Sequence, residues 1–354
     1  MDENDIVRYF LGANTAQGFY SLYDSFVSLD EGDFLWIIKG GAGCGKSSFM
    51  KKIGEAAEKA GLRVEYAFCS ADPDSLDGVY IPQLKTAYMD GTAPHIADAR
   101  MAASDSSYLN LGAYYDRKAM VKHKDELLRL KQETAHIYSK AYALLGAAGS
   151  IRRGWQKNLA GSEALEAAIS RVKGIGVREF GKRHRENGRE IKRFLSVISS
   201  TGLAAFPETV KGLCNRAYSL DNRFLLGEAA LGYLANMAIS TGYDIFTCPN
   251  PLCPESYEAV FVPALSLGFF CSDSVLNLVQ NTRRVRLDSF VSGEKRGEQR
   301  KCKKLSSALI DEAISALHET KLTHDKIEAL YNPNVNFDEI YKLSKQHIAE
   351  LSLK

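Results

Sequence analysis

The sequence predicts an α/β protein with two parallel-sheet cores that are related by internal duplication, each carrying a helical hairpin. Three observations support this fold class. An apolar strand, a glycine-rich loop and a helix follow one another near residue 40. A set of glycines and apolar positions recurs about 182 residues later. The last part of each half has long helical periodicity.

The first core is predicted to contain a buried strand, Phe34 to Ile38, followed by a complete G-x-x-x-x-G-K-[ST] (Walker A) pattern and a helix over residues 48–57. Glycines let the backbone fold around a phosphate chain with N–H groups pointing at its oxygens. Lys46 can reach the β- and γ-phosphates, and the Ser47 hydroxyl can ligate Mg²⁺. The alternative is a glycine turn that binds nothing. The predicted nucleotide-binding residues are Gly40, Gly41, Ala42, Gly43, Cys44, Gly45, Lys46, Ser47 and Ser48.

Cys44 lies inside this loop. Loop amides and Lys46 would lower the pKa of its thiol, so oxidation there could block nucleotide binding as a redox switch. The alternative, which we favour, is that the cysteine side chain points away from the phosphates.

A second strand is predicted over residues 62–69, and a polar turn with three aspartates follows it. Doubly wound sheets bind ligands outside the carboxyl ends of their strands, so we expect Asp72, Asp74 and Asp77 near the phosphates. Asp74 is our candidate for the group that polarises the attacking water or a substrate hydroxyl. Ordinary turn chemistry is the alternative.

The next strand, over residues 84–90, ends on Asp90. An aspartate at the carboxyl end of a neighbouring strand can orient metal-bound water beside the loop serine. Ser47 and Asp90 therefore form the predicted Mg²⁺ site, and Lys46, Asp90 and Asp74 are the predicted catalytic residues. The alternative for Asp90 is a strand-ending residue that begins a turn.

Helical periodicity covers residues 114–146 and 162–172, and it returns over residues 305–317 and 337–351. These segments are predicted to form a hairpin on each core, which would act as a lid, a substrate platform or a dimer arm, or only as packing. The basic run at residues 178–193 is diluted by three glutamates. We interpret it as a solvated connecting helix and not as a nucleic-acid surface.

The second half repeats the first at a nearly constant offset. Phe10-Leu11-Gly12 returns as Phe194-Leu195-Ser196 at an offset of 184, and Val79 to Leu84 returns as Val260 to Leu265 at 181. The predicted domains are residues 1–190, which bind nucleotide, and residues 191–354, a degenerate copy.

An offset of 182 places Glu228 on Lys46 and Ala229 on Ser47, while Cys271 takes the place of Asp90. A carboxylate in place of the ammonium group repels a phosphate chain. We therefore expect the second site to bind no nucleotide in the usual way, and to serve packing or a partner surface.

The composition is that of an ordinary globular protein. The chain has 354 residues, 45% of them hydrophobic and 25% charged, with a formal charge of +2. Three of the first five residues are acidic, where a signal peptide would be basic. The longest nearly apolar run, residues 259–271, is too short for a membrane helix and predicts a buried strand pair. Seven scattered cysteines indicate reduced thiols in a cytoplasm.

The combination of Phe10 to Thr15, the loop from Lys39 to Ser48, Asp74 to Gly78 and Asp90 to His95 resembles a bacterial group of tandem P-loop ATPase-like proteins. The resemblance covers nearly the whole chain, including the helical segments, and it implies two P-loop NTPase-like cores. Both halves usually carry a phosphate loop in that group, whose cellular role is poorly defined. Glu228 and Ala229 depart from that pattern.

The leading functional hypothesis is binding of Mg·ATP in the N-terminal half and hydrolysis of its γ-phosphate. A kinase that passes the phosphate to a small acceptor, and a nucleotide-dependent switch without turnover, are the alternatives. The lack of an N-K-x-D guanine-reading motif favours ATP over GTP. We expect no membrane partner and no nucleic acid, and a homo-oligomer or protein partner would bind through the second half.

Overall fold

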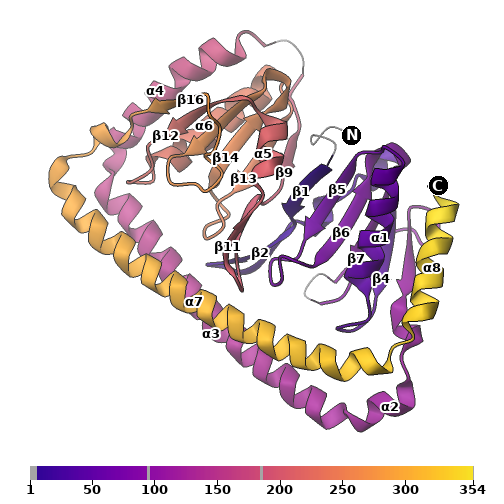
Figure 1. Cartoon of the computed structure of the whole chain (residues 1–354). Helices are drawn as coiled ribbons and strands as arrows, with labels where there is room; N and C mark the ends of the chain where they lie inside the picture. The colour runs from indigo at the N-terminus through magenta and orange to yellow at the C-terminus, as the bar shows by residue number, and fades with distance from the viewer. Residues whose placement is uncertain (1–5, 94–95, 184–185, 354) are drawn as a thin grey trace.

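The computed structural model describes residues 6–93, 96–183 and 186–353, and it contains two six-stranded sheets (Figure 1). The prediction of an α/β fold is confirmed. The first sheet has the strand order β1 (Ile6–Phe10), β5 (Val64–Phe68), β6 (Leu76–Ile81), β7 (Thr86–Asp90), β4 (Phe34–Lys39) and β8 (Ser106–Asn110). The second has the order β9 (Glu190–Lys192), β13 (Ile245–Pro249), β14 (Tyr257–Val262), β15 (Leu267–Cys271), β12 (Arg216–Leu220) and β16 (Thr282–Val285).

Both sheets are mixed, which corrects the prediction of parallel sheets. β6 runs antiparallel to β5 and β7, and β14 runs antiparallel to β13 and β15, while the other pairs are parallel. The cause is the length of the connections. Only residues 82–85 separate β6 from β7, and a parallel pair needs a crossover of a dozen residues or more.

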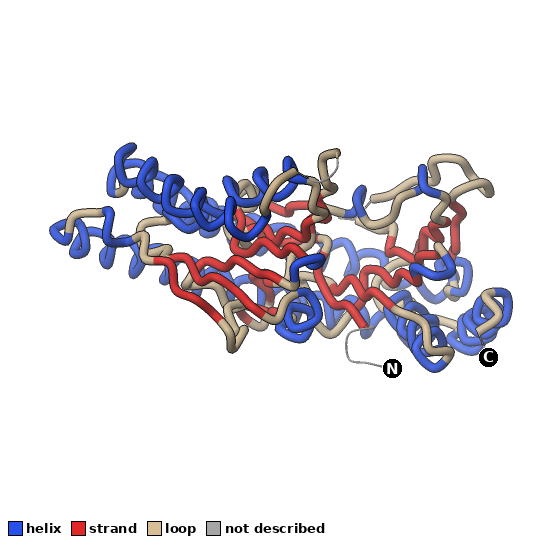
Figure 2. The backbone as a smooth tube through the Cα atoms, turned by 90° about the horizontal axis from the view of Figure 1, so that it is seen from above, coloured by secondary structure: helices blue, strands red, loops and turns tan. Residues whose placement is uncertain are grey.

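The two halves meet around a local twofold axis, as expected of an internal duplication. The Phe10 N–H donates to the Phe194 carbonyl at 2.8 Å, and the Phe194 N–H donates to the Phe10 carbonyl at 3.1 Å. Each residue thus bonds its own counterpart, which is the mark of a twofold contact. Two hairpins lie beside this point, β2 (Gly12–Thr15) with β3 (Gly18–Ser21) and β10 (Ser196–Ser199) with β11 (Gly202–Ala205), and β2 and β11 are labelled near the centre of Figure 1. Figure 2 shows the molecule from above, with strands in its middle part and helices toward both ends.

Two long helices connect the cores. α2 (Arg117–Lys122) leads into α3 (Lys124–Leu159), and α3 runs antiparallel beside α7 (Arg296–Tyr331) along one side of the molecule (Figure 1). Each long helix has 36 residues. Their shared core contains Ala141, Leu145, Ala148, Ala313, Ala316 and Leu317.

Because each long helix crosses to the other core, the halves exchange the helices that follow. α4 (Gly161–Phe180) packs on α6 (Leu226–Thr241) of the second core, and α8 (Phe337–Glu350) packs on α1 (Lys46–Lys59) of the first. The second core also carries α5 (Pro207–Leu213). The expected hairpin within each half is therefore replaced by a helix pair between the halves. Periodicity shows that a helix buries one face, but not which partner covers it.

Membrane crossing requires a long apolar helix. Within residues 6–93, 96–183 and 186–353, no helix has that length and apolar character. The apolar run at residues 259–271 instead forms most of β14 and all of β15, a buried strand pair as predicted, and the two strands are antiparallel.

The helix exchange predicts that α8 stabilises the first core. Ile340 is 5% exposed and packs in the same cluster as Phe49 and Ile53 of α1. Ile340→Ala removes this packing, and we expect a loss of about 2–4 kcal/mol in the free energy of unfolding, measured with urea. The matched control is Gln346→Ala on the exposed side of α8, which should cost less than about 0.5 kcal/mol. Equal effects of the two variants would contradict the packing.

The buried histidine of α8 predicts a pH dependence of stability. His347 is 6% exposed, its Nδ1 lies 3.1 Å from the Tyr88 hydroxyl, and burial lowers its pKa below the ordinary value. Below about pH 6.5 the imidazole of His347 binds a proton in the unfolded chain but stays neutral in the folded one. The contribution of His347 to stability is therefore fully present above that pH and is lost as the pH falls below it. The free energy of unfolding, measured with urea between pH 5 and 8, should depend on pH in this way in the wild type. The dependence should be smaller in His347→Gln. The control is His318→Gln at an exposed position, which should keep the pH dependence of the wild type. An unchanged pH dependence in His347→Gln would refute the role of His347.

Candidate functional site

The glycine loop joins β4 to α1, as the sequence predicts. Gly43 and Gly45 have φ values of 66° and 82°, in the left-handed region that favours glycine. A Cβ atom on Gly43 would lie 2.4 Å from Asn332 Oδ1, so a side chain there would also displace Asn332. α1 begins at Lys46, and the first N–H groups of a helix have no partner within it. The loop therefore places free amides and a positive helix end at one point.

Lys46 and Asp90 come together at this point. Lys46 Nζ donates to the carbonyls of Gly40 and Gly41, each at 2.8 Å, and lies 3.6 Å from Asp90 Oδ2. Asp90 ends β7, which pairs in parallel with β4, so both residues lie at the carboxyl edge of the sheet. Asp90 Oδ1 accepts hydrogen bonds from the N–H and the hydroxyl of Thr92 at 2.8 and 2.6 Å. These bonds fix the orientation of the carboxylate.

Ser47 lies beside them. Its Oγ accepts a hydrogen bond from the Leu76 N–H at 2.9 Å, at the start of β6. Ser47, Asp77 and Asp90 line one cavity of about 450 Å³, together with the loop. Asp77 is 4% exposed and accepts a 2.6 Å hydrogen bond from the Tyr23 hydroxyl. Hydroxyl and carboxylate oxygens are the ligands that Mg²⁺ prefers, so these residues could hold that cation.

Asp74 lies apart from this group. Its side chain is exposed and does not line the cavity, and its backbone carbonyl accepts a 2.6 Å hydrogen bond from Lys51 Nζ. Asp72 of the turn and Asp77 of β6 line the cavity instead. Asp77 lies in the strand because β6 already begins at Leu76. The geometry therefore gives no support to the catalytic role expected for Asp74. Pro94 and His95, which complete the motif after Asp90, lie outside the described residues.

Cys44 is one of the loop residues that line the cavity, but its thiol is packed in the core of the first sheet. Its side chain is 1% exposed, and its sulfur lies where a Cβ atom on Gly40 would be. Burial raises the pKa of the Cys44 thiol, and the nearby Lys46 only partly offsets this effect. This direction argues against the redox switch, because desolvation outweighs the attraction of Lys46, and the burial of the side chain agrees better with the alternative that we favour.

The α3–α7 helix pair and the turn after α7 supply one wall of the cavity, and the α7 part comes from the second half, which the sequence did not reveal. The lining residues from the long helices and the turn after α7 are Thr134, Tyr138, Thr320, Lys321, His324, Glu328 and Asn332. Lys321 Nζ lies 3.2 Å from Asp72 Oδ2 and thereby links α7 to the turn of the first core. No sequence signal connects positions that far apart. Only the α3–α7 pairing brings them together.

The second loop differs from the first by more than its side chains. The buried positions of α1 (Phe49, Met50, Ile53, Gly54, Ala57) match those of α6 (Ala230, Leu231, Leu234, Ala235, Ala238) at an offset of 181. In this register Gly227 takes the place of Lys46 and Glu228 that of Ser47, one position away from our expectation. The lysine is missing in either register. Cys271 ends β15 in the place of Asp90, as predicted.

Glu228 fills the second site with its own hydrogen bonds. Its carboxylate pairs with Arg152 of α3 and accepts hydrogen bonds from Ser256 Oγ at 2.8 Å and from Asn222 Nδ2 at 3.3 Å. Glu228 is 6% exposed. Burial acts to lower the pKa of Arg152, but Glu228 and Asp273 raise it further, so the arginine stays charged. A buried ion pair thus occupies this loop.

Comparison of the chain with models of protein families, with curated proteins and with solved structures found no match in any of the three. A function can therefore be inferred only from the geometry of the two loops and of the residues around them.

The buried pair predicts a large penalty for removing Arg152. Arg152→Ala leaves the Glu228 carboxylate buried without its cation, which should cost about 3–5 kcal/mol of unfolding free energy in urea. The matched control is its neighbour Arg153, whose side chain is 45% exposed and whose Nη1 lies 3.4 Å from Glu255 Oε1. Arg153→Ala should cost less than about 1 kcal/mol. A similar cost for both variants would show that the Arg152–Glu228 pair has no special role.

Proposed function

We propose that this chain is a P-loop NTPase-like protein that binds Mg·ATP at residues 40–48 and hydrolyses its γ-phosphate. The observation that carries the proposal is the position of Lys46. It stands at the start of α1, 3.6 Å from Asp90, in a cavity that Ser47 also lines. The cavity volume of about 450 Å³ is in the range of small-molecule sites.

Binding would use the loop amides and the lysine together. The N-terminal N–H groups of α1 donate to phosphate oxygens, and the helix dipole favours the negative charge. Lys46 Nζ now donates to two neutral carbonyls. A phosphate oxygen offers it a charge-assisted hydrogen bond, which is stronger than either of them.

Ser47 and Asp90 fit the Mg²⁺ ion of such a complex. The Ser47 oxygen has two lone pairs and uses one to accept from Leu76, so the other remains for the cation. Asp90 Oδ2 faces the same region and can orient a metal-bound water. When bound, Mg²⁺ neutralises charge on the phosphates. Asp77, buried in the cavity, replaces Asp74 as our candidate for orienting the attacking water.

A nucleotide-dependent switch is the second candidate, and one observation favours it. The turn after α7 packs on the loop, since Asn332 Oδ1 lies where a Cβ atom on Gly43 would be. A nucleotide in the loop would therefore lie beside the segment that directly continues α7 of the α3–α7 pair. Turnover separates the two candidates, because a switch would bind ATP tightly and release negligible phosphate.

The test is calorimetry with Mg·ATP, counting sites per chain, together with a phosphate-release assay. We expect one site in the wild type, and at least about a tenfold weaker affinity in Lys46→Ala, because a charge-assisted hydrogen bond is lost. Lys59→Ala, an exposed residue in the last turn of α1, is the matched control and should bind as the wild type does. Binding that survives Lys46→Ala, or no binding in the wild type, would refute the proposal.

A further inference from the structure

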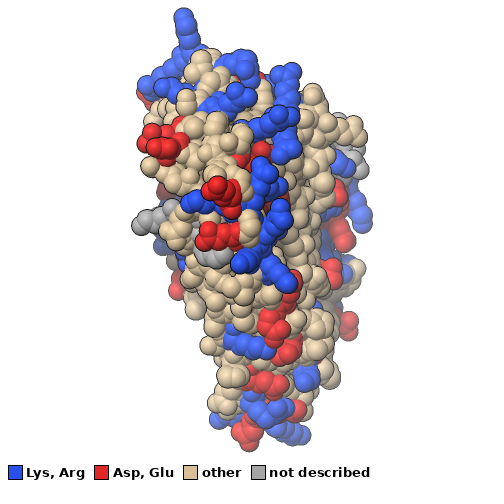
Figure 3. All heavy atoms as spheres, turned by 90° about the vertical axis from the view of Figure 1, so that its left-hand side faces the viewer, with Lys and Arg blue, Asp and Glu red and all other residues tan. Residues whose placement is uncertain are grey.

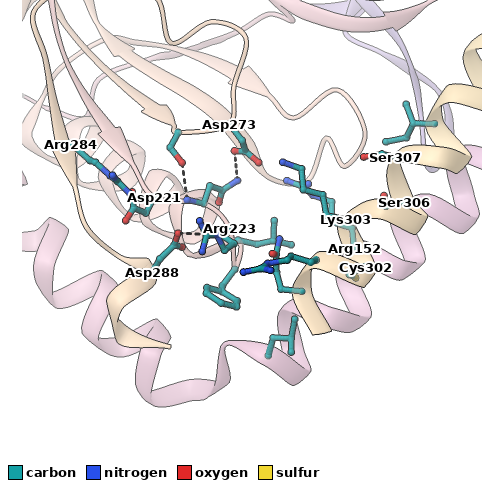
Figure 4. Close-up of a pocket in the computed structure, with 18 residues that line it drawn as sticks. Arg152, Asp221, Arg223, Asp273, Arg284, Asp288, Cys302, Lys303, Ser306 and Ser307 are labelled. Atoms are coloured by element: carbon teal, nitrogen blue, oxygen red, sulfur yellow. Dashed lines mark hydrogen bonds and ion pairs between the residues drawn. The ribbon is translucent and has the colours of Figure 1, made fainter. Parts of the chain in front are cut away.

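A second cavity, of about 510 Å³, lies between the loop of the second core and the first half of α7 (Figure 4). The loop contributes Asp221 to Leu225, and α7 contributes Arg300, Lys303 and Ser306. Arg152 of α3 lies at the same site. The cavity is therefore composite, like the first one, but it has no phosphate-binding lysine at its helix terminus.

Positive charge exceeds negative charge around this cavity. Five cationic side chains face three carboxylates, those of Asp221, Asp273 and Asp288. Three of the cations have carboxylate partners: Arg284 with Asp221 at 2.7 Å, Arg223 with Asp288 at 3.9 Å, and Arg152 with Glu228. Arg300 and Lys303 have no ion pair within the described ranges of the chain. Lys and Arg side chains also gather over the upper part of the face that Figure 3 shows, which is the side where α7 begins.

Two buried polar atoms in the cavity also lack partners. Among the residues that the structure describes, Arg152 Nε and Asp288 Oδ1 are buried side-chain atoms without a hydrogen-bond partner, and both residues line this cavity. A buried donor or acceptor without a partner costs about 1–3 kcal/mol. Both residues line the cavity, so a ligand with an oxyanion and a hydrogen-bond donor would give each atom a partner once these side chains turn toward it.

From these observations we propose that the second cavity binds a small organic oxyanion, a phosphate or carboxylate that also carries a hydroxyl group. Arg300 and Lys303 hold the anionic group from the α7 side, and Arg152 Nε donates to it from α3. The hydroxyl group donates to Asp288 Oδ1. Guanidinium groups match phosphate and carboxylate oxygens in pairs, which suits this class of ligand.

This site is chemically different from the first loop, and it does not depend on ATP binding there. Glu228 occupies the loop, and its N–H donates to Asn222 Oδ1 at 3.2 Å, so the start of α6 is already capped. A nucleoside triphosphate would meet a buried carboxylate at that point. The anion is therefore held by side chains on the long helices and not by loop amides.

The experiment uses the Lys46→Ala chain, so that the first loop does not contribute to binding. Glycerol 3-phosphate and citrate, which both carry a hydroxyl group, serve as a phosphate and a carboxylate probe, titrated by calorimetry at about 0.15 M salt, where long-range charge effects are screened. We expect one site per chain for at least one probe. The double variant Arg300→Ala with Lys303→Ala should bind this probe at least about tenfold more weakly, because two charged donors are lost.

The matched control is Lys301→Ala with Lys304→Ala, which removes two exposed cations of the same helix that do not line the cavity. The affinity of this control for the probe should stay within about twofold of that of the Lys46→Ala chain, since distant surface charges contribute little at this salt concentration. Binding of neither probe, or equal weakening by the two double variants, would overturn the proposal. If the probe binds as expected but the wild type binds no ATP, only the proposed function is refuted and the second site stands.

Discussion

The antiparallel pairing of α3 and α7 determines most of the architecture. A helix of 36 residues is about 54 Å long, enough to pass from one core to the other. Alanines at the contact, such as Ala141 and Ala316, let the two helices approach closely. α3 starts at the first core and ends at the second, so α4, which follows it, covers the second core. α7 runs the opposite way, so α8 covers the first core. Each cavity therefore has walls from both halves of the sequence.

The same scaffold holds two loops with opposite charge. The first loop carries the ammonium group of Lys46, and its carboxylate partner is Asp90 on the neighbouring strand. The second carries the carboxylate of Glu228, and its cationic partner is Arg152 on a long helix. The bounds of α3 and α7 differ by 172 residues, which makes His324 the counterpart of Arg152. His324 lines the first cavity, so one long-helix position faces the loop in both sites.

The sequence predicted what depends on local pattern. The strand, loop and helix around residue 40 were predictable, because apolar periodicity and glycine spacing act within about twenty residues. The place of Asp90 was predictable because parallel strands end at one edge. The antiparallel course of β6 and the exposed position of Asp74 were not, since a short polar segment does not show where a strand begins. Lys321 and Asn332 were not predictable, because only tertiary packing brings α7 to the first loop.

The degenerate second loop needs no nucleotide to explain why its fold persists. The second half covers α1 with α8 and closes the first cavity with Lys321 and Asn332, and neither contribution depends on the residues of its own loop. The Arg152–Glu228 pair is likewise accounted for, since the buried carboxylate needs a cation. Arg300 and Lys303 have no such structural reason, because they are exposed and lack ion-pair partners in the described part of the chain. Two unpaired cations beside a cavity with unpartnered buried atoms are the features that packing alone leaves unexplained.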